Sequence, residues 1–197
     1  RGFLQGAARF AVGSAGAAGL LAALTPQFAT AQQIAPDDAR LSARFVEFPS
    51  PKGYGTARGY LVKPAEAKEP LPVVLVVHEN RGLNPHIEDI TRRLALEGFI
   101  AFAPDALFPL GGYPGDEDAA RALFAKLEQP KSREDFIAAA NYLLALKGGN
   151  GKLGVVGFCY GGAISSFLAR RMPQVIAAAP FYGGAPATED VPNIKAE

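Results

Sequence analysis

The sequence is poor in the residues that form disulfides and metal sites. It contains one cysteine, Cys159, two histidines and no tryptophan in 197 residues. One cysteine excludes an internal disulfide, and no spaced cluster of His, Cys and Asp indicates a metal site, so we expect neither a metal nor another cofactor. In an oxidising compartment the lone thiol would be either buried or kept for its reactivity.

An excess of charge of one sign is also lacking. Lysine and arginine number 20 against 19 aspartates and glutamates, which gives a formal net charge of +1. Without a basic cluster the chain lacks the field that attracts nucleic acid, so nucleic acid is not an expected partner. The composition is 49% hydrophobic and 20% charged. This is enough apolar content to bury the core of one globular domain, and it excludes bulk disorder.

Residues 1–31 differ from the rest because they contain no acidic residue. They have two arginines, a weakly apolar centre at 10–24 and an Ala-Thr-Ala sequence that ends at Ala31. This pattern predicts a cleaved export signal, and the opening RGFL resembles a twin-arginine signal, so we expect export to the periplasm. The alternative is an uncleaved membrane anchor, which the many Gly, Ala, Ser and Thr residues disfavour. The mature part, residues 32–197, is expected to have no membrane span.

From about residue 42 the sequence alternates between strand and helix patterns. Alternating segments flanked by Gly and Pro predict antiparallel edge strands at 43–48 and 55–64, and β-branched runs predict buried strands. The further predicted strands are 71–80, 99–106, 152–158 and 174–184, and the predicted helices are 85–99, 116–127, 132–147 and 161–172. This order predicts an α/β fold, with a mostly parallel sheet and helices on both faces.

Three helix ends carry specific sequence signals. The helix at 85–99 is expected to stop at Gly98, because glycine is a common residue just after a helix. The helix at 116–127 has an acidic first turn, which the helix dipole favours. The helix at 132–147 is expected to begin with a capping box formed by Ser132 and Asp135.

The segment GVVGFCYGG places Cys159 between a predicted strand and a predicted helix. Its G-x-C-x-G pattern is typical of a nucleophile elbow, with glycines where a side chain would clash. At the helix N-terminus a thiolate would be stabilised, and the N–H of Tyr160 can donate to a developing oxyanion. The alternative is a core cysteine beside glycines that strand–helix packing requires.

Four segments together resemble the dienelactone hydrolases, thiol-using members of the α/β-hydrolase fold. They are VVLVVHENRG, GFIAFAPDALF, GKLGVVGFCYGG and AAAPFYGG. The resemblance runs from about residue 42 to the last residue. GFCYGG is its most specific part, because most α/β-hydrolases have serine at the position of Cys159. The resemblance implies a three-layer α/β sandwich and a small ester or lactone as substrate, with an anionic substrate as one option.

The resemblance also implies roles for two residues after the first central strand. In the family a glutamate there contacts the thiol and helps to form the thiolate, and Glu79 occupies that position. For Glu79 the alternative is a solvated loop carboxylate. The next residue of the family supplies a second oxyanion N–H, which here is that of Asn80.

Three further residues are candidates for substrate binding. The resemblance places Arg121 where the family binds a substrate carboxylate, and the alternative is a solvated surface arginine. Arg81 stands where the family has an apolar residue, and it is either a second anion contact or a partner in a loop salt bridge. His78 is expected at a strand end, lining the pocket, and His86 in the first turn of a helix.

A thiolate–imidazole hydrolase also needs an acid and a histidine, which follow the nucleophile in this fold. No histidine follows Cys159, and Glu189 and Asp190 are the only acids between it and Glu197. The chain therefore resembles the N-terminal portion of such a hydrolase, and residues 32–197 are expected to form an incomplete domain. We expect little turnover and an exposed last parallel strand.

The sequence leaves three functions open. The first, which we favour, is a carboxylic ester or lactone hydrolase with a cysteine nucleophile. The second is a non-catalytic fragment or degenerate homologue that binds a small ligand or a partner through the same pocket. The third is a redox-sensing thiol, because an activated cysteine is also readily oxidised.

Overall fold

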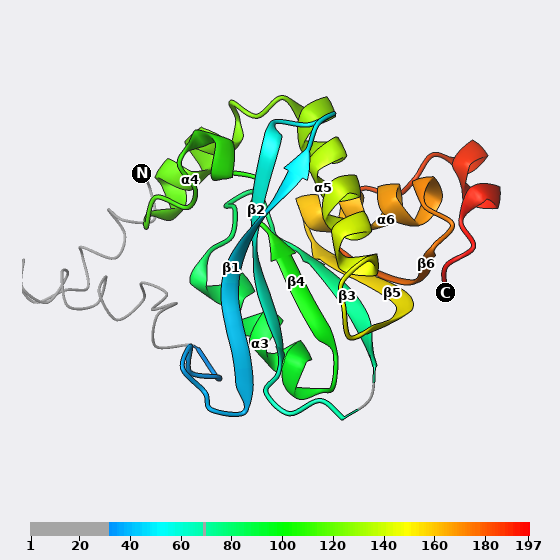
Figure 1. Cartoon of the computed structure of the whole chain (residues 1–197). Coiled ribbons are helices and arrows are strands. Elements are labelled where there is room, and N and C mark those ends of the chain that lie inside the picture. Colours follow the sequence, from blue (N-terminus) through cyan, green and yellow to red (C-terminus); the bar gives the residue numbers. More distant parts are fainter. Residues whose placement is uncertain (1–31, 69) are drawn as a thin grey trace, which may run out of the picture. The chain divides into compact units, whose positions relative to one another are not determined.

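The structure of the protein is a computed structural model that describes residues 32–68 and 70–197 (Figure 1). The export signal expected in residues 1–31 lies outside these residues. Within the described ranges, no helix combines the length and the apolar character that crossing a bilayer requires.

Six strands form one mixed sheet. They are β1 Leu41–Ser50, β2 Gly55–Pro64, β3 Leu71–Val77, β4 Ile100–Pro104, β5 Gly149–Phe158 and β6 Val175–Phe181. Their order in the sheet is β1-β2-β4-β3-β5-β6. β1 and β2 are antiparallel to each other and β2 is antiparallel to β4, whereas β4, β3, β5 and β6 run parallel. The predicted parallel sheet with antiparallel N-terminal strands at its edge is confirmed.

Helices cover both faces of this sheet. The helices of the described residues are α3 Pro85–Leu96, η1 Phe108–Leu110, α4 Glu117–Phe124, α5 Gln129–Leu144, α6 Tyr160–Arg171 and η2 Thr188–Asn193, where η marks a 3₁₀ helix. One face packs against α3, and the opposite face packs against α5 and α6 (Figure 1). The predicted three-layer sandwich is therefore present.

Strand β3 shows how the sequence builds the two cores. Its side chains alternate between faces, so that Val74 and Val76 pack in the core on the α3 side. Leu75 and Val77 pack in the core that α5 and α6 cover. An unbroken run of β-branched and other apolar residues is what a strand needs when both of its faces are buried.

Helices α3 and α4 begin within one residue of their predicted starts at 85 and 116, whereas α4 ends at Phe124, before the predicted residue 127. Asn84 caps α3, because its side-chain oxygen accepts a hydrogen bond from the Ile87 N–H at 3.1 Å. Asp116 caps α4 in the same way through the Ala119 N–H at 2.8 Å. The helix α3 ends two residues before Gly98, whose φ of +90° is a conformation that glycine adopts without strain.

The predicted capping box at Ser132 and Asp135 is wrong. Helix α5 begins at Gln129, earlier than expected, with Pro130 in its first turn. Proline fits there because the first N–H groups of a helix have no intrahelical acceptor. Ser132 and Asp135 therefore lie inside the helix, where both are buried. Asp135 accepts a hydrogen bond from the Tyr54 N–H at 3.1 Å.

Strand β6 forms one edge of the sheet in the described part of the chain. Its apolar side chains Ile176 and Phe181 are 48% and 49% exposed, as expected for the last parallel strand. Glu197 pairs with this edge, since its N–H donates to the Ile176 carbonyl at 3.1 Å and its carbonyl accepts from the Ala178 N–H at 2.8 Å.

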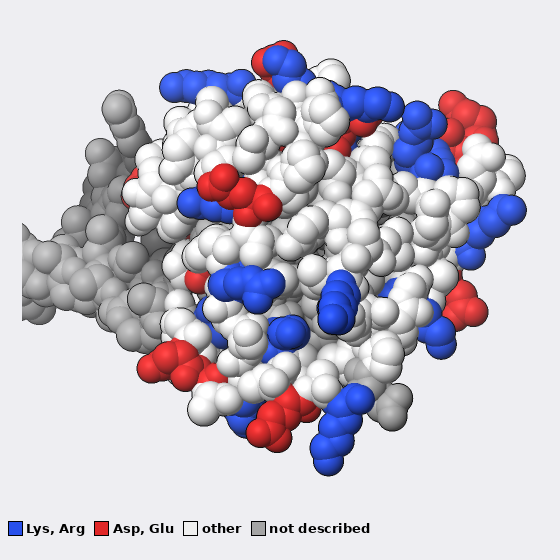
Figure 2. Space-filling view, in the orientation of Figure 1, with Lys and Arg blue, Asp and Glu red and all other residues white. Residues whose placement is uncertain are grey.

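Charged side chains of both signs are interspersed on the face shown in Figure 2. Several exposed pairs are local in sequence, including Arg40 with Asp38 at 2.6 Å and Lys131 with Glu128 at 2.8 Å. Such local pairing of opposite charges is consistent with the formal net charge of +1.

A buried arginine fastens the start of the described chain to α3. Arg92 is completely buried, and its Nε donates to the Ile34 carbonyl at 2.9 Å. The neighbouring Asp89 lies 3.8 Å from the Arg92 guanidinium. Asp89 also accepts hydrogen bonds from the N–H groups of Gln33 and Ile34, at 2.9 and 2.8 Å. Each buried charge thus has a partner, as burial of an ion requires.

Replacing Arg92 by methionine tests this contact. We expect Arg92→Met to lower the free energy of unfolding by about 3–5 kcal/mol, because the Asp89 carboxylate is left buried without its cation. Urea unfolding followed by circular dichroism measures the change. The control is Arg93→Met on the same helix, where the arginine is exposed. Equal unfolding midpoints for the two variants would contradict the role of Arg92.

Candidate active site

Cys159 lies in a one-residue turn between β5 and α6. Its backbone has φ 54° and ψ −111°, a strained conformation that costs a residue other than glycine about 1–3 kcal/mol. The turn is held by hydrogen bonds of 3.0 Å, from the Cys159 N–H to the Phe181 carbonyl and from the Gly162 N–H to the Cys159 carbonyl. Cys159 is partly exposed, and it stands at the N-terminus of α6.

Glycines around this turn allow backbones to touch. A Cβ on Gly157 would lie 2.0 Å from the carbonyl oxygen of Gly161. A Cβ on Gly161 would lie 2.2 Å from the carbonyl oxygen of Val77, at the end of β3. Both distances are far inside van der Waals contact. The sequence-based prediction that side chains would clash two residues before and two after Cys159 is confirmed.

Two backbone N–H groups near the turn are free to donate hydrogen bonds. The first turn of α6 packs against the end of β3 through Gly161, which brings Tyr160 close to the segment that holds Asn80. Within residues 32–68 and 70–197, neither the Tyr160 N–H nor the Asn80 N–H donates a hydrogen bond to another residue. Paired donors next to a nucleophile can stabilise an oxyanion.

The Tyr160 side chain is locked among aromatic rings. The centre of its ring lies 4.7 Å from that of Phe124, 6.2 Å from that of Phe136 and 6.3 Å from that of His78. Its hydroxyl shares a 3.1 Å hydrogen bond with the Ser132 hydroxyl. Burial raises the pKa of Tyr160 to about 12, so the hydroxyl stays neutral. These contacts from α4, α5 and the residue after β3 fix the residue that follows the cysteine.

Tyr182 joins the site, although sequence reasoning assigned it no role. It lies one residue beyond β6, and its hydroxyl donates to Glu79 Oε1 at 3.0 Å. Partial desolvation raises the pKa of Tyr182, and the charges of Glu79 and Cys159 add to the effect. Glu79, Cys159 and Tyr182 therefore come together from the ends of three adjacent parallel strands, where open α/β sheets place their sites. The sequence signals for Tyr182 were its position near the end of the predicted strand 174–184 and its place in the segment AAAPFYGG.

His78 is part of the protein interior. Its side chain is completely buried, Nδ1–H donates to the Glu79 carbonyl at 2.5 Å, and Nε2 accepts from the Ala106 N–H at 3.1 Å. Burial lowers the pKa of His78, although the carboxylates of Asp105 and Glu79 act in the opposite direction. The ring has no free nitrogen to offer a substrate, so the structure provides no support for the predicted pocket-lining role.

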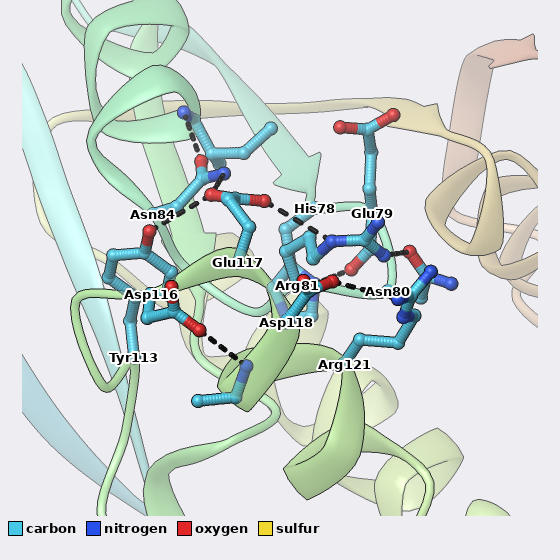
Figure 3. A network of polar contacts seen from close by, with 12 residues as sticks. His78, Glu79, Asn80, Arg81, Asn84, Tyr113, Asp116, Glu117, Asp118 and Arg121 are labelled. Atoms are coloured by element: carbon cyan, nitrogen blue, oxygen red, sulfur yellow. Dashed lines mark hydrogen bonds and ion pairs between the residues drawn. The ribbon is translucent and has the colours of Figure 1, made fainter. Parts of the chain in front are cut away.

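Arg81 belongs to a network that ties the loop after β3 to α4 (Figure 3). Its Nε lies 3.2 Å from Glu117 Oε2, and its guanidinium also donates to the side-chain oxygen of Asn80. Glu117 accepts two further hydrogen bonds, from the Tyr113 hydroxyl at 2.9 Å and from the Asn84 amide at 3.2 Å. Of the two sequence-based alternatives for Arg81, the structure shows the loop salt bridge.

Arg121 lies on the exposed side of α4. Its side chain is 58% exposed and pairs with Asp118 on the same helix at 2.8 Å. This is the solvated arrangement that sequence analysis gave as the alternative to anion binding. His86 lies in the first turn of α3, as predicted, and it is exposed.

The acids that follow Cys159 in the sequence do not form a triad here. Asp190 forms an ion pair with Arg170 of α6. Glu189 is exposed. Among the described residues, no three His, Cys, Asp or Glu side chains gather as metal ligands would.

A cavity of about 390 Å³ opens beside the elbow. Tyr160, Phe167, Arg133 and Arg170 are among the residues that line it. The guanidinium carbons of Arg133 and Arg170 lie 5.5 and 5.8 Å from the centre of the Phe167 ring, within cation–π range. The cavity thus combines apolar surface with two arginines and Asp190, and Cys159 is not among its lining residues. No sequence motif singled out these two arginines.

Known proteins share this arrangement of elements. Residues 57–197 match the dienelactone hydrolase family. A protein of Escherichia coli (strain K12), "Putative hydrolase fragment YghX", is 53% identical over 100 residues, which are 51% of this chain and 86% of that protein. A "Putative carboxymethylenebutenolidase" of the same strain is 37% identical over 169 residues, which are 84% of this chain and 60% of that protein.

Solved structures agree with the sequence relatives. A "Putative Dienelactone Hydrolase" from Klebsiella pneumoniae is 31% identical with a TM-score of 0.61, over 76% of this chain and 65% of that chain. The dienelactone hydrolase-like phosphotriesterase P91 from metagenomic libraries is 26% identical with a TM-score of 0.64, over 80% of this chain and 66% of that chain. The chain thus spans 60% to 66% of the length of the carboxymethylenebutenolidase and of these two structures.

The close approach at Gly161 can be tested with two glycines near the site. We expect Gly161→Ala to lower the free energy of unfolding by about 1–3 kcal/mol, because the new Cβ must push the Val77 carbonyl away. Gly184→Ala is the control, since a Cβ there meets nothing within 4 Å. Thermal unfolding of both variants measures the difference. A Gly161→Ala protein as stable as Gly184→Ala would disprove the tight contact.

Burial of neutral His78 predicts a pH dependence of stability. Below the ordinary histidine pKa of about 6.5, His78 binds a proton in the unfolded chain but stays neutral in the folded chain. The free energy of unfolding therefore falls as the pH falls from 7, by at most about 1.4 kcal/mol per pH unit. We expect this contribution to disappear in His78→Gln and to remain in His86→Gln, whose histidine is exposed. Urea unfolding between pH 5 and 7 measures it. The same pH slope in wild type and His78→Gln would refute the expectation.

Proposed function

The chain belongs to the dienelactone hydrolase family, and on this premise we propose that it is built for hydrolysis of small carboxylic esters or lactones with Cys159 as the nucleophile. The observation that carries the proposal is the strained backbone of Cys159, with φ 54°, at the N-terminus of α6. A core cysteine has no need of such strain. Strain of this kind persists where the surrounding structure enforces it, which is common at reactive sites.

The proposed first step is acylation of the thiol. The Cys159 thiolate attacks the carbonyl carbon of the ester, and the N–H groups of Tyr160 and Asn80 donate to the oxyanion that forms. When the oxyanion collapses, the C–O bond to the alcohol breaks. The leaving alkoxide takes up the proton that was released when the thiol ionised, and the acyl group remains on sulfur as a thioester. Attack of water on the thioester then releases the acid and restores the thiol.

Glu79 is proposed to help the Cys159 thiol to form the thiolate. Its carboxylate accepts the Tyr182 hydroxyl at 3.0 Å, and in Figure 3 it points away from the Arg81–Glu117 pair. It is therefore not neutralised by that arginine. Within residues 32–68 and 70–197 no ion pair joins Glu79 to a cation, and we assign its carboxylate to the thiol of Cys159.

The substrate is proposed to be a small ester or lactone, with an anionic one favoured by the cavity beside Tyr160. Arg133 and Arg170 supply the positive charge there, whereas Arg121 is paired at the surface. Because Arg170 already pairs with Asp190, Arg133 is the arginine that we assign to an anionic group.

Acylation of Cys159 can be measured without turnover. We expect p-nitrophenyl acetate to release about one p-nitrophenol per chain, followed by little further release, because no histidine follows Cys159 to activate water. Mass spectrometry should locate the acetyl group on Cys159, and Cys159→Ala should abolish the burst. Sustained turnover by this chain, or a burst in the alanine variant, would contradict the mechanism.

The other two functions predict different outcomes in the same assay. If iodoacetamide reacts with Cys159 no faster than with a model thiol, and Glu79→Gln changes nothing, a ligand-binding homologue is favoured. Rapid formation of a sulfenic acid by dilute peroxide, without acylation by the ester, would favour a redox sensor. Lys126→Gln, at an exposed position on the loop after α4, is a control that should leave the burst unchanged.

A further inference from the structure

The protonation of the His78 ring is dictated by its two partners. A backbone carbonyl can only accept a hydrogen bond, so Nδ1 must carry the proton that goes to the Glu79 oxygen, at 2.5 Å. A backbone N–H can only donate, so Nε2 must be the bare nitrogen that accepts from Ala106, at 3.1 Å. His78 is thus a neutral imidazole in one defined tautomer. Because the side chain is completely buried, water does not compete for either bond.

The carbonyl that His78 binds belongs to the peptide group that contains the Asn80 N–H. No cis peptide bond is present among the described residues, so this peptide is trans. In a planar trans peptide the C=O and N–H bonds point in opposite directions. A bond that pulls the Glu79 carbonyl toward the buried ring therefore turns the Asn80 N–H away from the ring, on the side where it has no acceptor within the described chain.

The His78 ring also contacts the second oxyanion residue. It stacks on the Tyr160 ring at 25° with centres 6.3 Å apart, and it meets the Phe136 ring at 61° with centres 6.0 Å apart. Its bond to Ala106 anchors it to the segment after β4. The ring is therefore held on several sides before any substrate arrives, which is the condition for an oxyanion site that needs no reorganisation.

We propose that His78 is a positioning residue that aims the Asn80 N–H at the oxyanion by holding the Glu79–Asn80 peptide through its Nδ1–H. This proposal rests on the proposed function, in which Asn80 and Tyr160 stabilise the oxyanion. His78 itself touches no substrate. Its Nδ1–H bond orients the Asn80 N–H. Its ring packs against the ring of Tyr160, the residue that supplies the other N–H.

Two amide substitutions separate the bonds of His78. In His78→Asn the amide nitrogen can replace Nδ1 and keep the donor to the Glu79 carbonyl. In His78→Gln the amide oxygen can replace Nε2 and keep the acceptor for the Ala106 N–H, but the donor to Glu79 is lost. Both variants exchange a buried ring for a buried amide, so a purely structural role predicts similar effects of the two.

The readout is the rate of Cys159 acylation by p-nitrophenyl acetate divided by the rate of its alkylation by iodoacetamide. Only acylation passes through an oxyanion, so the ratio reports oxyanion stabilisation separately from thiol reactivity. We expect His78→Gln to lower the ratio up to about 100-fold, the scale of losing one oxyanion donor, and His78→Asn to restore most of it. His86→Asn and His86→Gln are the matched controls at an exposed histidine, and they should leave the ratio unchanged.

Each outcome decides the proposal. Equal ratios in wild type, His78→Asn and His78→Gln would overturn it and leave the proposed function standing, whereas a wild type that ester does not acylate would overturn both. Equal losses of acylation in both His78 variants would overturn it in favour of a packing role. Should the variants not fold, long-range ¹H–¹⁵N NMR of the wild type at pH 7 still decides: an Nδ1-protonated ring is expected, and an Nε2-protonated or doubly protonated ring excludes the proposed bond.

Discussion

Contact between the first turn of α6 and the end of β3 is the constraint on which the rest of the site depends. Gly161 has space for no Cβ, because one would lie 2.2 Å from the Val77 carbonyl oxygen. This contact sets the distance between the turn that holds Cys159 and the segment that holds Glu79 and Asn80. Backbone meets backbone at this point, so the turn and the segment lie side by side at the ends of neighbouring parallel strands.

Buried side chains then keep the geometry in place. The Tyr160 ring packs against Phe124, Phe136 and His78. Its hydroxyl shares a hydrogen bond with the Ser132 hydroxyl inside α5. On the other side, the Arg81–Glu117 pair fastens the loop after β3 to α4. The strain at Cys159 is thus opposed by many ordinary contacts. Such enforcement lets a strained turn persist in a folded chain.

The elements and the elbow were predictable because their signals are local. The β-branched run of β3 and the glycines around Cys159 report their own conformations, whatever the rest of the chain does. The start of α5 was misplaced because Ser132 and Asp135 form a good capping pattern, but Pro130 supports an earlier start. The partner of Ser132 is Tyr160, 28 residues away, and local sequence patterns carry no information about such a pairing.

The sequence by itself determined the α/β order, the family resemblance and the turn with flanking glycines at Cys159, because these depend on residue type and spacing. Only the tertiary structure decided what the charged and aromatic residues near the thiol do. His78 is interior, Arg81 belongs to a salt bridge, Arg121 is at the surface and Tyr182 reaches Glu79. The physical reason is that a polar side chain takes its role from its partners, and parallel strands bring those partners together from distant parts of the chain.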